Sequence, residues 1–547
     1  MRPALRSSIV GTVAALALVL ALPAQAAPRG REESLLPVLT PVPNDALARA
    51  LRSGRLSPAE YALSRAQSLF RLRKIRRRFG DVARPDTHDA TFILRDLALR
   101  AGELSGEERR RANALLARPS DGAADPLGHG YDAGAVERRV CTSVCVHWVA
   151  TTADAPPLAD LDADGTPDWV ETTLATLEEV RTTEVTRFRY RAPRSDLSSR
   201  TNGGNGLLDV YLADIGDAGY YGYCTTDDPH APAANGYSYS DVSAYCVLDD
   251  DFDAAQFPEG GGVAALRVTA AHELFHAIQY AYDWLEDLWL MEGTAAWIED
   301  EVYDGVNDNR GFLAGASALS RPGVPIDFGA RGFEYGAWIF WRYLSERFGR
   351  AIVLDVWRNA DAARGGRDDY SLEAAKRALG RRRTTFRTAF AQFGIANRLR
   401  RYSEGSSYPA PPTSAAYTLT PAFARTGWHS RFLYHMTNRY ISFRPGAGVT
   451  RTAVLRVGVR LPRPAAAPRA TLVVRRASGD IRVHPVPLDR RGDGAKTVAF
   501  GRGVVSRVDL VLTNGSTRFD CFWDTQFSCA GLPRDDGGAY RFDARVR

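Results

Sequence analysis

The chain has 547 residues, of which 45% are hydrophobic and 24% charged. This length exceeds one ordinary domain and predicts two or three folded units with sizeable cores. The formal net charge of +6 falls to +4 without Arg2 and Arg6 of the first segment, which is too small a charge to indicate a nucleic-acid partner.

The first 26 residues have the form of a secretory signal peptide. Arg2 and Arg6 precede a long apolar run, and Ala24-Gln25-Ala26 provides a small-residue cleavage site. No later stretch reaches the roughly 18 uncharged apolar residues that a transmembrane helix needs. We therefore expect a secreted, extracellular protein without a membrane span.

Residues 27–120 are expected to form a helical segment. Ser57-Pro58-Ala59-Glu60 and Ser105-Gly106-Glu107-Glu108 both match the Ser-x-x-Glu capping box that begins helices. Residues 71–80 carry a cluster of arginines, for which we favour a solvated helix face over a phosphate- or membrane-binding patch. A helical segment that follows a signal peptide can be a propeptide. Residues 121–135, rich in Gly, Asp and Pro, are predicted to be a linker.

The remaining sequence predicts two further units, which makes the fold class multidomain α+β. In residues 136–405 the strand-like stretches CVHWVA and LLDVYLADIG are mixed with helical periodicity, as in a mixed α/β domain. Residues 414–547 contain short alternating strands separated by turn residues, the pattern of an antiparallel β-sandwich. Helical periodicity is found in residues 168–190, 263–282, 292–302 and 335–348.

Six cysteines fall into three pairs that are close in the sequence. An even number in an exported chain favours disulfides over thiolate ligands or nucleophiles. The predicted pairs are Cys141 with Cys145, Cys224 with Cys246, and Cys521 with Cys529.

Residues 160–171, DLDADGTPDWVE, match the calcium-binding loop of an EF-hand. Acidic residues occupy loop positions 1, 3, 5, 9 and 12, and glycine occupies position 6, where the loop turns sharply. Pro156 and Pro157 argue against an incoming helix, so we expect a lone loop that binds Ca²⁺ to stabilise structure. The expected ligands are Asp160, Asp162, Asp164, the Thr166 carbonyl, Asp168 and Glu171. For a weaker acidic cluster, LDDDFD at residues 248–253, we favour a solvated turn over a second calcium site.

Residues 271–276, AHELFH, give the first indication of chemistry. On a helix, His272 and His276 project from one face a turn apart, so both rings can reach one zinc ion. Glu273 lies about 100° round the helix axis, beside the position where water would bind, and is a candidate base. The alternative is a buried, satisfied histidine pair on a packed helix.

A catalytic zinc ion usually has three protein ligands, so a third is expected. The next histidine is His429, far along the chain, whereas Glu292 opens a new helical run, EGTAAWIEDEV. Gly293 and the alanines that follow are small, which would let this helix pack close to the first one. Glu299 is on the same face as Glu292 and is expected to orient a ligand histidine; the alternative is a solvent-facing charge.

These residues resemble the gluzincin metallopeptidases. HELFH followed by DLWLMEGTAAWIEDE is similar to the aminopeptidase branch, with its His-Glu-x-x-His and Trp-Leu-Asn-Glu-Gly-Phe-Ala, and closer to bacterial secreted metalloproteases with Trp-x-x-Glu-Gly-x-Ala. The resemblance implies a zincin-like domain in which His272, His276 and Glu292 bind Zn²⁺ and Glu273 is the catalytic base. By the same resemblance, EYGAWIFWRYLSERFG makes Tyr335 the residue that stabilises the transition state.

We therefore expect a zinc endopeptidase that acts on a protein or peptide substrate. The aminopeptidase motif Gly-x-Met-Glu-Asn, which anchors a free amino terminus, is missing, and PEGGGVAALRVTA stands before the histidines. The alternative is a non-catalytic secreted binding or adhesion protein in which zinc and calcium only hold structure, although such a site needs no base like Glu273. A nucleic-acid partner is not expected, because Phe70 and Phe79 are the only aromatics beside the arginine cluster. The sequence does not predict an oligomeric state.

Overall fold

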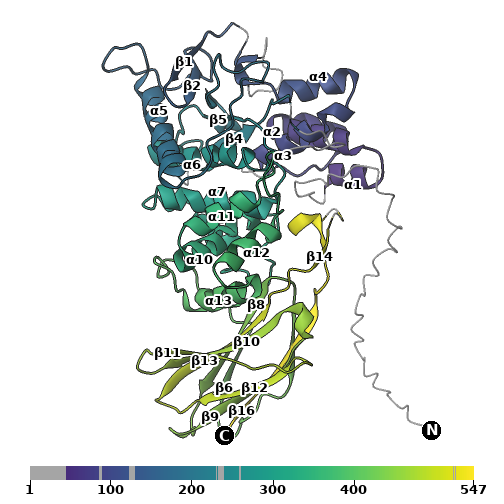
Figure 1. The fold of residues 1–547 in the computed structure, drawn as a ribbon, viewed down its shortest axis with the longest axis vertical. Helices are drawn as coiled ribbons and strands as arrows, with labels where there is room; N and C mark the ends of the chain where they lie inside the picture. The colour runs from purple at the N-terminus through teal and green to yellow at the C-terminus, as the bar shows by residue number, and fades with distance from the viewer. Residues whose placement is uncertain are drawn as a thin grey trace, which may run out of the picture.

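The structure, a computed structural model, describes residues 45–85, 89–121, 130–132, 134–229, 231, 240–257, 260–521, 523 and 525–547. The molecule is elongated, with helices and a mixed sheet at one end, further helices in the middle and a β unit at the other end (Figure 1). The predicted signal peptide, residues 1–26, and most of the predicted linker, residues 121–135, lie outside the described residues.

The N-terminal segment is helical, as predicted. At the start of its longest helix a complete capping box forms, because Ser57 Oγ accepts from the Glu60 N–H at 3.2 Å and Glu60 accepts from the Ser57 N–H at 2.7 Å. The second predicted capping box is wrong, since the Ser105 side chain makes no hydrogen bond to its helix. The helices are α1 (Ala46–Arg52), α2 (Pro58–Phe79), α3 (Ala90–Arg100) and α4 (Gly106–Leu115).

A five-stranded mixed sheet follows, with the order β1-β2-β3-β5-β4. The central strands β2, β3 and β5 are parallel, whereas β1 and β4 run antiparallel to their neighbours at the two edges. The central strands β2, β3 and β5 are buried on both faces and are mainly apolar, whereas the edge strand β1 is largely exposed and begins with charged residues. The strands are β1 (Glu137–Cys141), β2 (Cys145–Val149), β3 (Asp209–Ala213), β4 (Gly222–Thr225) and β5 (Tyr245–Asp249).

Successive residues of β3 face opposite sides of this sheet, and each side has its own layer of helices. Val210 and Leu212 join the core formed with α5 (Asp168–Arg181) and α6 (Gly262–Tyr280). Tyr211, between them, joins the core formed with the N-terminal helices. The N-terminal segment therefore covers one face of the sheet (Figure 1).

The middle of the molecule is a group of helices built around tryptophan. Trp289 and Trp341 stack at 5.1 Å between ring centroids, and both are fully buried, as are Trp297, Trp338 and Trp357. Burial of each large aromatic side chain contributes about 2–3 kcal/mol. The helices are α7 (Leu288–Val302), α8 (Arg310–Gly315), α9 (Phe333–Gly336), α10 (Trp338–Phe348), α11 (Ala351–Asn359), α12 (Leu372–Arg381) and α13 (Phe386–Leu399).

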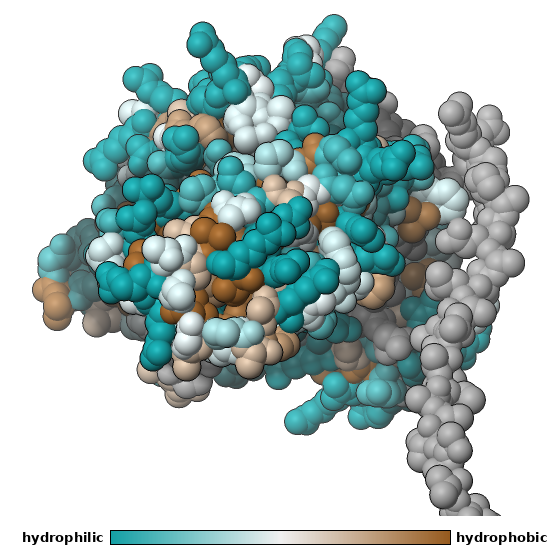
Figure 2. All heavy atoms as spheres, turned by 90° about the horizontal axis from the view of Figure 1, so that it is seen from below, coloured by the Kyte–Doolittle hydropathy of each residue, from teal (hydrophilic) through white to brown (hydrophobic). Residues whose placement is uncertain are grey.

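The C-terminal unit consists of two packed sheets, with the orders β11-β10-β13-β8-β6 and β12-β9-β16-β7. Neighbouring strands are antiparallel except that β6 is parallel to β8, so the predicted antiparallel sandwich holds apart from this pair. Seen from this end, the surface is mostly hydrophilic, with apolar side chains gathered near its centre (Figure 2). The strands are β6 (Ala415–Leu419), β7 (His429–Leu433), β8 (Thr437–Pro445), β9 (Val454–Arg460), β10 (Pro468–Arg476), β11 (Ile481–Pro485), β12 (Asp493–Ala499), β13 (Val505–Asn514) and β16 (Gly538–Val546).

A buried arginine joins the helices to the sandwich. Arg398, on α13, donates from Nη2 to Asp509 Oδ1 and Ser442 Oγ, both at 2.8 Å, and from Nη1 to the Pro411 carbonyl at 3.0 Å. Tyr440 of β8 donates to the Gly394 carbonyl of α13 at 3.0 Å. Because a buried charge without its partner is strongly unfavourable, this network holds the two units in one relative position.

All three predicted disulfides are present. Cys224 and Cys246 lie directly opposite each other on β4 and β5, so their bond fixes the edge strand to the sheet. Cys141 and Cys145 close the turn between β1 and β2. In the described part of the chain, no helix combines the length and apolarity required to cross a membrane.

We expect replacement of Cys224 and Cys246 by alanine to lower the free energy of unfolding by about 3 kcal/mol, because their bond closes a loop of 22 residues. Replacement of Cys141 and Cys145, which are 4 residues apart, is the matched control and should cost about 2 kcal/mol. Denaturant unfolding of both double variants measures the difference. A larger loss in the control would contradict the loop-closure account.

Candidate metal centre

The two predicted histidines lie side by side on α6, opposite a carboxylate of α7. The imidazole centroids of His272 and His276 are 4.7 Å apart. Glu292 Oε2 is 3.1 Å from His272 Nε2 and 3.6 Å from His276 Nε2. The three side chains therefore offer ligand atoms that all lie within 4.8 Å of one another. The structure brings together all three residues that the sequence predicted as zinc ligands.

Hydrogen bonds at the far side of each ring fix its orientation. Glu299 Oε1 is 2.6 Å from His272 Nδ1, and the Gln279 amide oxygen is 2.8 Å from His276 Nδ1. Gln279 in turn donates to the Met291 carbonyl of α7 at 2.9 Å. Both rings therefore present Nε2 to the centre. Glu299 is only 6% exposed, so it occupies the predicted orienting position and is not a solvent-facing charge.

Glu292 has the surroundings that a divalent cation would suit. The residue is 1% exposed, and its Oε1 atom is buried with no hydrogen-bond partner among the described residues. Burial opposes ionisation, but hydrogen bonds with His272 and His276 lower the pKa of Glu292 to about 2. Two imidazole nitrogens and one carboxylate oxygen are a donor set that Zn²⁺ accepts, and three protein ligands leave a position open. The residues present fit a catalytic zinc ion.

The start of β7 in the sandwich carries His429, far from α6 along the chain, and Tyr417 and Phe542 surround its ring. The prediction that the third ligand is a carboxylate and not this histidine agrees with the arrangement. The helix of Glu292 begins at Leu288, four residues earlier than predicted, because Leu288 to Met291 are buried in the core. Gly293 allows close packing, but against Ala337 and Trp341 rather than against α6.

The side chain of Glu273 lies between the backbone of α6, to which it belongs, and the edge strand β4. The side chain is 7% exposed, and a Cβ added to Gly222 would lie 2.9 Å from Glu273 Cγ. The sulfur of Cys224, two residues along β4, is 3.0 Å from the Glu273 carbonyl oxygen. Gly222, the first residue of β4, therefore leaves room for the Glu273 side chain.

Tyr335 borders the same centre. The ring is fully buried and stacks on His272 at 6.0 Å between centroids, with Phe312 on its other side at 4.9 Å. Burial, followed by the nearby carboxylates of Glu292 and Asp89, raises the pKa of the Tyr335 hydroxyl. The phenol therefore stays protonated and can donate a hydrogen bond.

A neighbour of the centre that the sequence did not indicate is α3 of the N-terminal segment. Phe92 contacts His276 edge-on, with 5.5 Å between ring centroids. Thr91 Oγ1 accepts the backbone N–H of Cys224 on the edge strand at 3.1 Å. Arg95, fully buried, donates to the carbonyls of Trp284 and Glu286 at 2.9 and 3.1 Å. This helix therefore occupies the outer edge of β4 beside the histidines.

The predicted calcium loop has the turn that such a site needs. Carboxylate oxygens of Asp160, Asp162 and Asp164 lie within 4.8 Å of one another. Asp160 Oδ2 accepts from the Gly165 N–H at 2.9 Å, and Gly165 has the positive φ of 95° that position 6 requires. Asp168 and Glu171 begin α5, the Thr166 N–H is bound to Asp164, and desolvation and the four neighbouring aspartates raise the pKa of Glu171.

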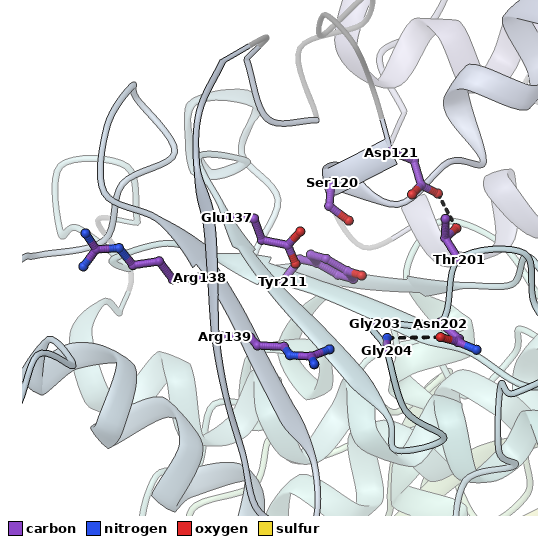
Figure 3. Close-up of a pocket in the computed structure, with 10 residues that line it drawn as sticks. All are labelled: Ser120, Asp121, Glu137, Arg138, Arg139, Thr201, Asn202, Gly203, Gly204 and Tyr211. Atoms are coloured by element: carbon purple, nitrogen blue, oxygen red, sulfur yellow. Dashed lines mark hydrogen bonds between the residues drawn. The ribbon is translucent and has the colours of Figure 1, made fainter.

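In a separate polar cluster, both ring nitrogens of a buried histidine already have carboxylate partners. His147 is held between Glu137 at 2.5 Å and Asp209 at 2.8 Å, and the nearby sulfur of Cys145 is committed to a disulfide. Beside it lies a polar pocket of about 450 Å³, lined by strand and loop residues (Figure 3). The lining includes Tyr211 and Asn202 but none of the residues around His272.

Comparison with known proteins adds no family assignment. The chain matches no protein-family model and no curated protein. The interpretation of the centre therefore depends on its own geometry.

We expect Glu299→Ala to weaken zinc binding about 10- to 100-fold, because His272 loses the carboxylate that fixes its ring. Competition with a chromogenic chelator measures the affinity. Glu299→Gln keeps an acceptor oxygen and should lose less, and Glu373→Ala, at an exposed position of α12, is the control. Unchanged zinc affinity in Glu299→Ala would show that the carboxylate does not orient the ligand.

Proposed function

We propose that the protein is a secreted zinc-dependent endopeptidase of the gluzincin type. The observation that carries this proposal is the convergence of His272, His276 and Glu292, together with Glu273, which follows His272 on α6 and packs against the edge strand β4. A purely structural metal site needs no such carboxylate and usually closes all four positions. The arrangement therefore favours hydrolysis over the alternative of a non-catalytic binding or adhesion protein.

The residues of the centre divide the chemistry between them. A zinc ion bound by the two histidines and Glu292 would supply Lewis acidity, polarising a peptide carbonyl and lowering the pKa of water. Glu273 accepts the proton of the attacking water and passes it to the leaving amine nitrogen. Tyr335 donates a hydrogen bond to the oxygen on which negative charge develops. Burial of all these groups strengthens each electrostatic interaction.

The edge strand provides a place for an extended peptide. β4 is the outermost strand of the sheet, and its first residue, Gly222, touches Glu273. A peptide added along β4 would pair through its main chain and bring its own carbonyls toward the base. Main-chain pairing in mid-peptide suits an endopeptidase, as does the missing amino-terminal anchor motif.

We infer that the N-terminal segment keeps this centre latent. Thr91 already binds a backbone N–H of β4, and Phe92 covers His276, so α3 takes the place that a peptide would use. The burial of Arg95 against carbonyls after α6 anchors the helix there. Residues 27–120 thus act as an inhibitory propeptide.

Glu273→Gln should lower kcat for an unfolded protein substrate by at least 100-fold, because the amide cannot accept the water proton. Zinc content and Tm should stay close to those of the wild-type protein, since Glu273 is not a ligand. Fragment analysis by mass spectrometry shows whether cleavage is internal. Full activity in this variant would rule out Glu273 as the base.

We expect cleavage within the linker to activate the protein. A site for a specific protease inserted at residues 121–135 allows the uncut and cut forms to be compared, and activity should rise at least 10-fold once the N-terminal segment has dissociated. Phe92→Ala should raise the activity of the uncut form by weakening the contact with His276. Arg110→Ala, on the exposed face of α4, is the control. Equal activity of uncut and cut protein, both active, would contradict latency without affecting the zinc mechanism.

A further inference from the structure

The carboxyl ends of two parallel strands bring three aspartates together on a part of the sheet distinct from the histidine centre. Ala213 of β3 pairs with Asp249 of β5, so Asp214 and Asp250 follow at neighbouring positions. Oxygen atoms of Asp214, Asp249 and Asp250 lie within 4.8 Å of one another. Asp249 is 0% and Asp250 4% exposed, so the sequence-based preference for a solvated turn at residues 248–253 is wrong.

No cationic side chain in the described part of the chain balances these charges. Within the described ranges, no lysine, arginine or histidine forms an ion pair with any of the three aspartates. Asp250 is the extreme case, because its buried carboxylate also makes no hydrogen bond to another described residue. Buried carboxylates normally have a positively charged partner, and no described residue supplies one to these three.

A neutral oxygen completes the group. Gln256 Oε1 is buried without a hydrogen-bond partner, while its Nε2 donates to Asp214 Oδ1 and Asp217 Oδ1 at 3.0 Å. The two nitrogen contacts fix the amide orientation. A Cβ added to Gly216 would lie 2.6 Å from both Gln256 Oε1 and Asp249 Oδ1, so glycine leaves the space in which these oxygens converge. The donors are all oxygen, which suits a hard divalent cation.

We propose that Asp214, Asp249, Asp250 and Gln256 bind a Ca²⁺ ion. Calcium is favoured over Mg²⁺ because it accepts an irregular set of carboxylate and amide oxygens, whereas Mg²⁺ demands a near-octahedral shell and retains water. The site is separate from both the histidine centre and the loop at residues 160–171, and it does not depend on the proposed peptidase activity.

The bound ion would also stabilise the loop that leads into α6, the helix that carries the two histidines. Asp249 Oδ2 accepts the Phe252 N–H at 2.7 Å, and the Phe252 carbonyl accepts the Gly262 N–H at 2.7 Å. Gly262 is the first residue of α6. Two hydrogen bonds therefore link a proposed calcium ligand to the start of the helix that carries His272 and His276.

Calcium titration of the zinc-loaded, calcium-depleted full chain by isothermal titration calorimetry tests the site. Asp250→Asn is nearly isosteric and should bind one Ca²⁺ fewer than the wild-type protein, and its calcium-dependent rise in Tm should shrink. Asp162→Ala removes the loop site independently, so the double variant should lose a further ion. Asp253→Asn, at an exposed position of the same turn, is the matched control and should bind as the wild type does.

Asp214→Asn provides a second measurement at a less buried ligand, in case Asp250→Asn does not fold. Circular dichroism of each variant verifies the fold before titration. If Asp250→Asn and Asp214→Asn bind the same number of Ca²⁺ ions as the wild-type protein with the same affinity, the proposal is overturned. If the single loss occurs only with Asp162→Ala, the cluster is likewise not a calcium site.

Discussion

The close packing of α6 against α7 is the contact on which the rest of this structure depends. Glu292 and Glu299, two turns apart on α7, contact opposite nitrogens of His272, and Gln279 ties the second histidine back to the α7 backbone. These polar groups lie beside a core of stacked tryptophans, where an unpartnered charge would be costly. The two helices can therefore pack in this way only because the histidines of α6 contact the carboxylates of α7. A bound cation would offset the remaining cost of burying Glu292.

The sheet positions the proposed catalytic residues, and the N-terminal segment packs beside them. β4 is joined to β5 by a disulfide and touches Glu273 through Gly222, so an edge strand, the proposed base and the histidine helix lie in one small region. α3 lies along the same edge, and its Thr91 uses a hydrogen-bonding position of β4. The edge of β4 could pair with a peptide, but in this structure α3 occupies it. For this reason we propose that this form of the protein is latent.

Prediction from the sequence was most reliable where the signal was local. The spacing of His272 and His276 places both on one helix face. Each cysteine forms a disulfide with its neighbouring cysteine in the sequence, as predicted. The loop from Asp160 follows a dense local pattern and has the predicted glycine turn. Errors arose where packing decides. The Ser105 cap lacks its hydrogen bond, α7 starts earlier than its acidic residue suggested, and β6 pairs in parallel with β8.

From the sequence alone we predicted an export signal, two candidate metal-binding motifs and a change from helical to alternating patterning, because these patterns depend on residues that are close together in the chain. The sequence could not show that α3 covers His276, that Arg398 locks the helices to the sandwich, or that Asp214 meets Asp250. These contacts join residues that are far apart in the chain. They depend on tertiary structure, because the order of the strands and the burial of the sheet determine which distant side chains are buried together.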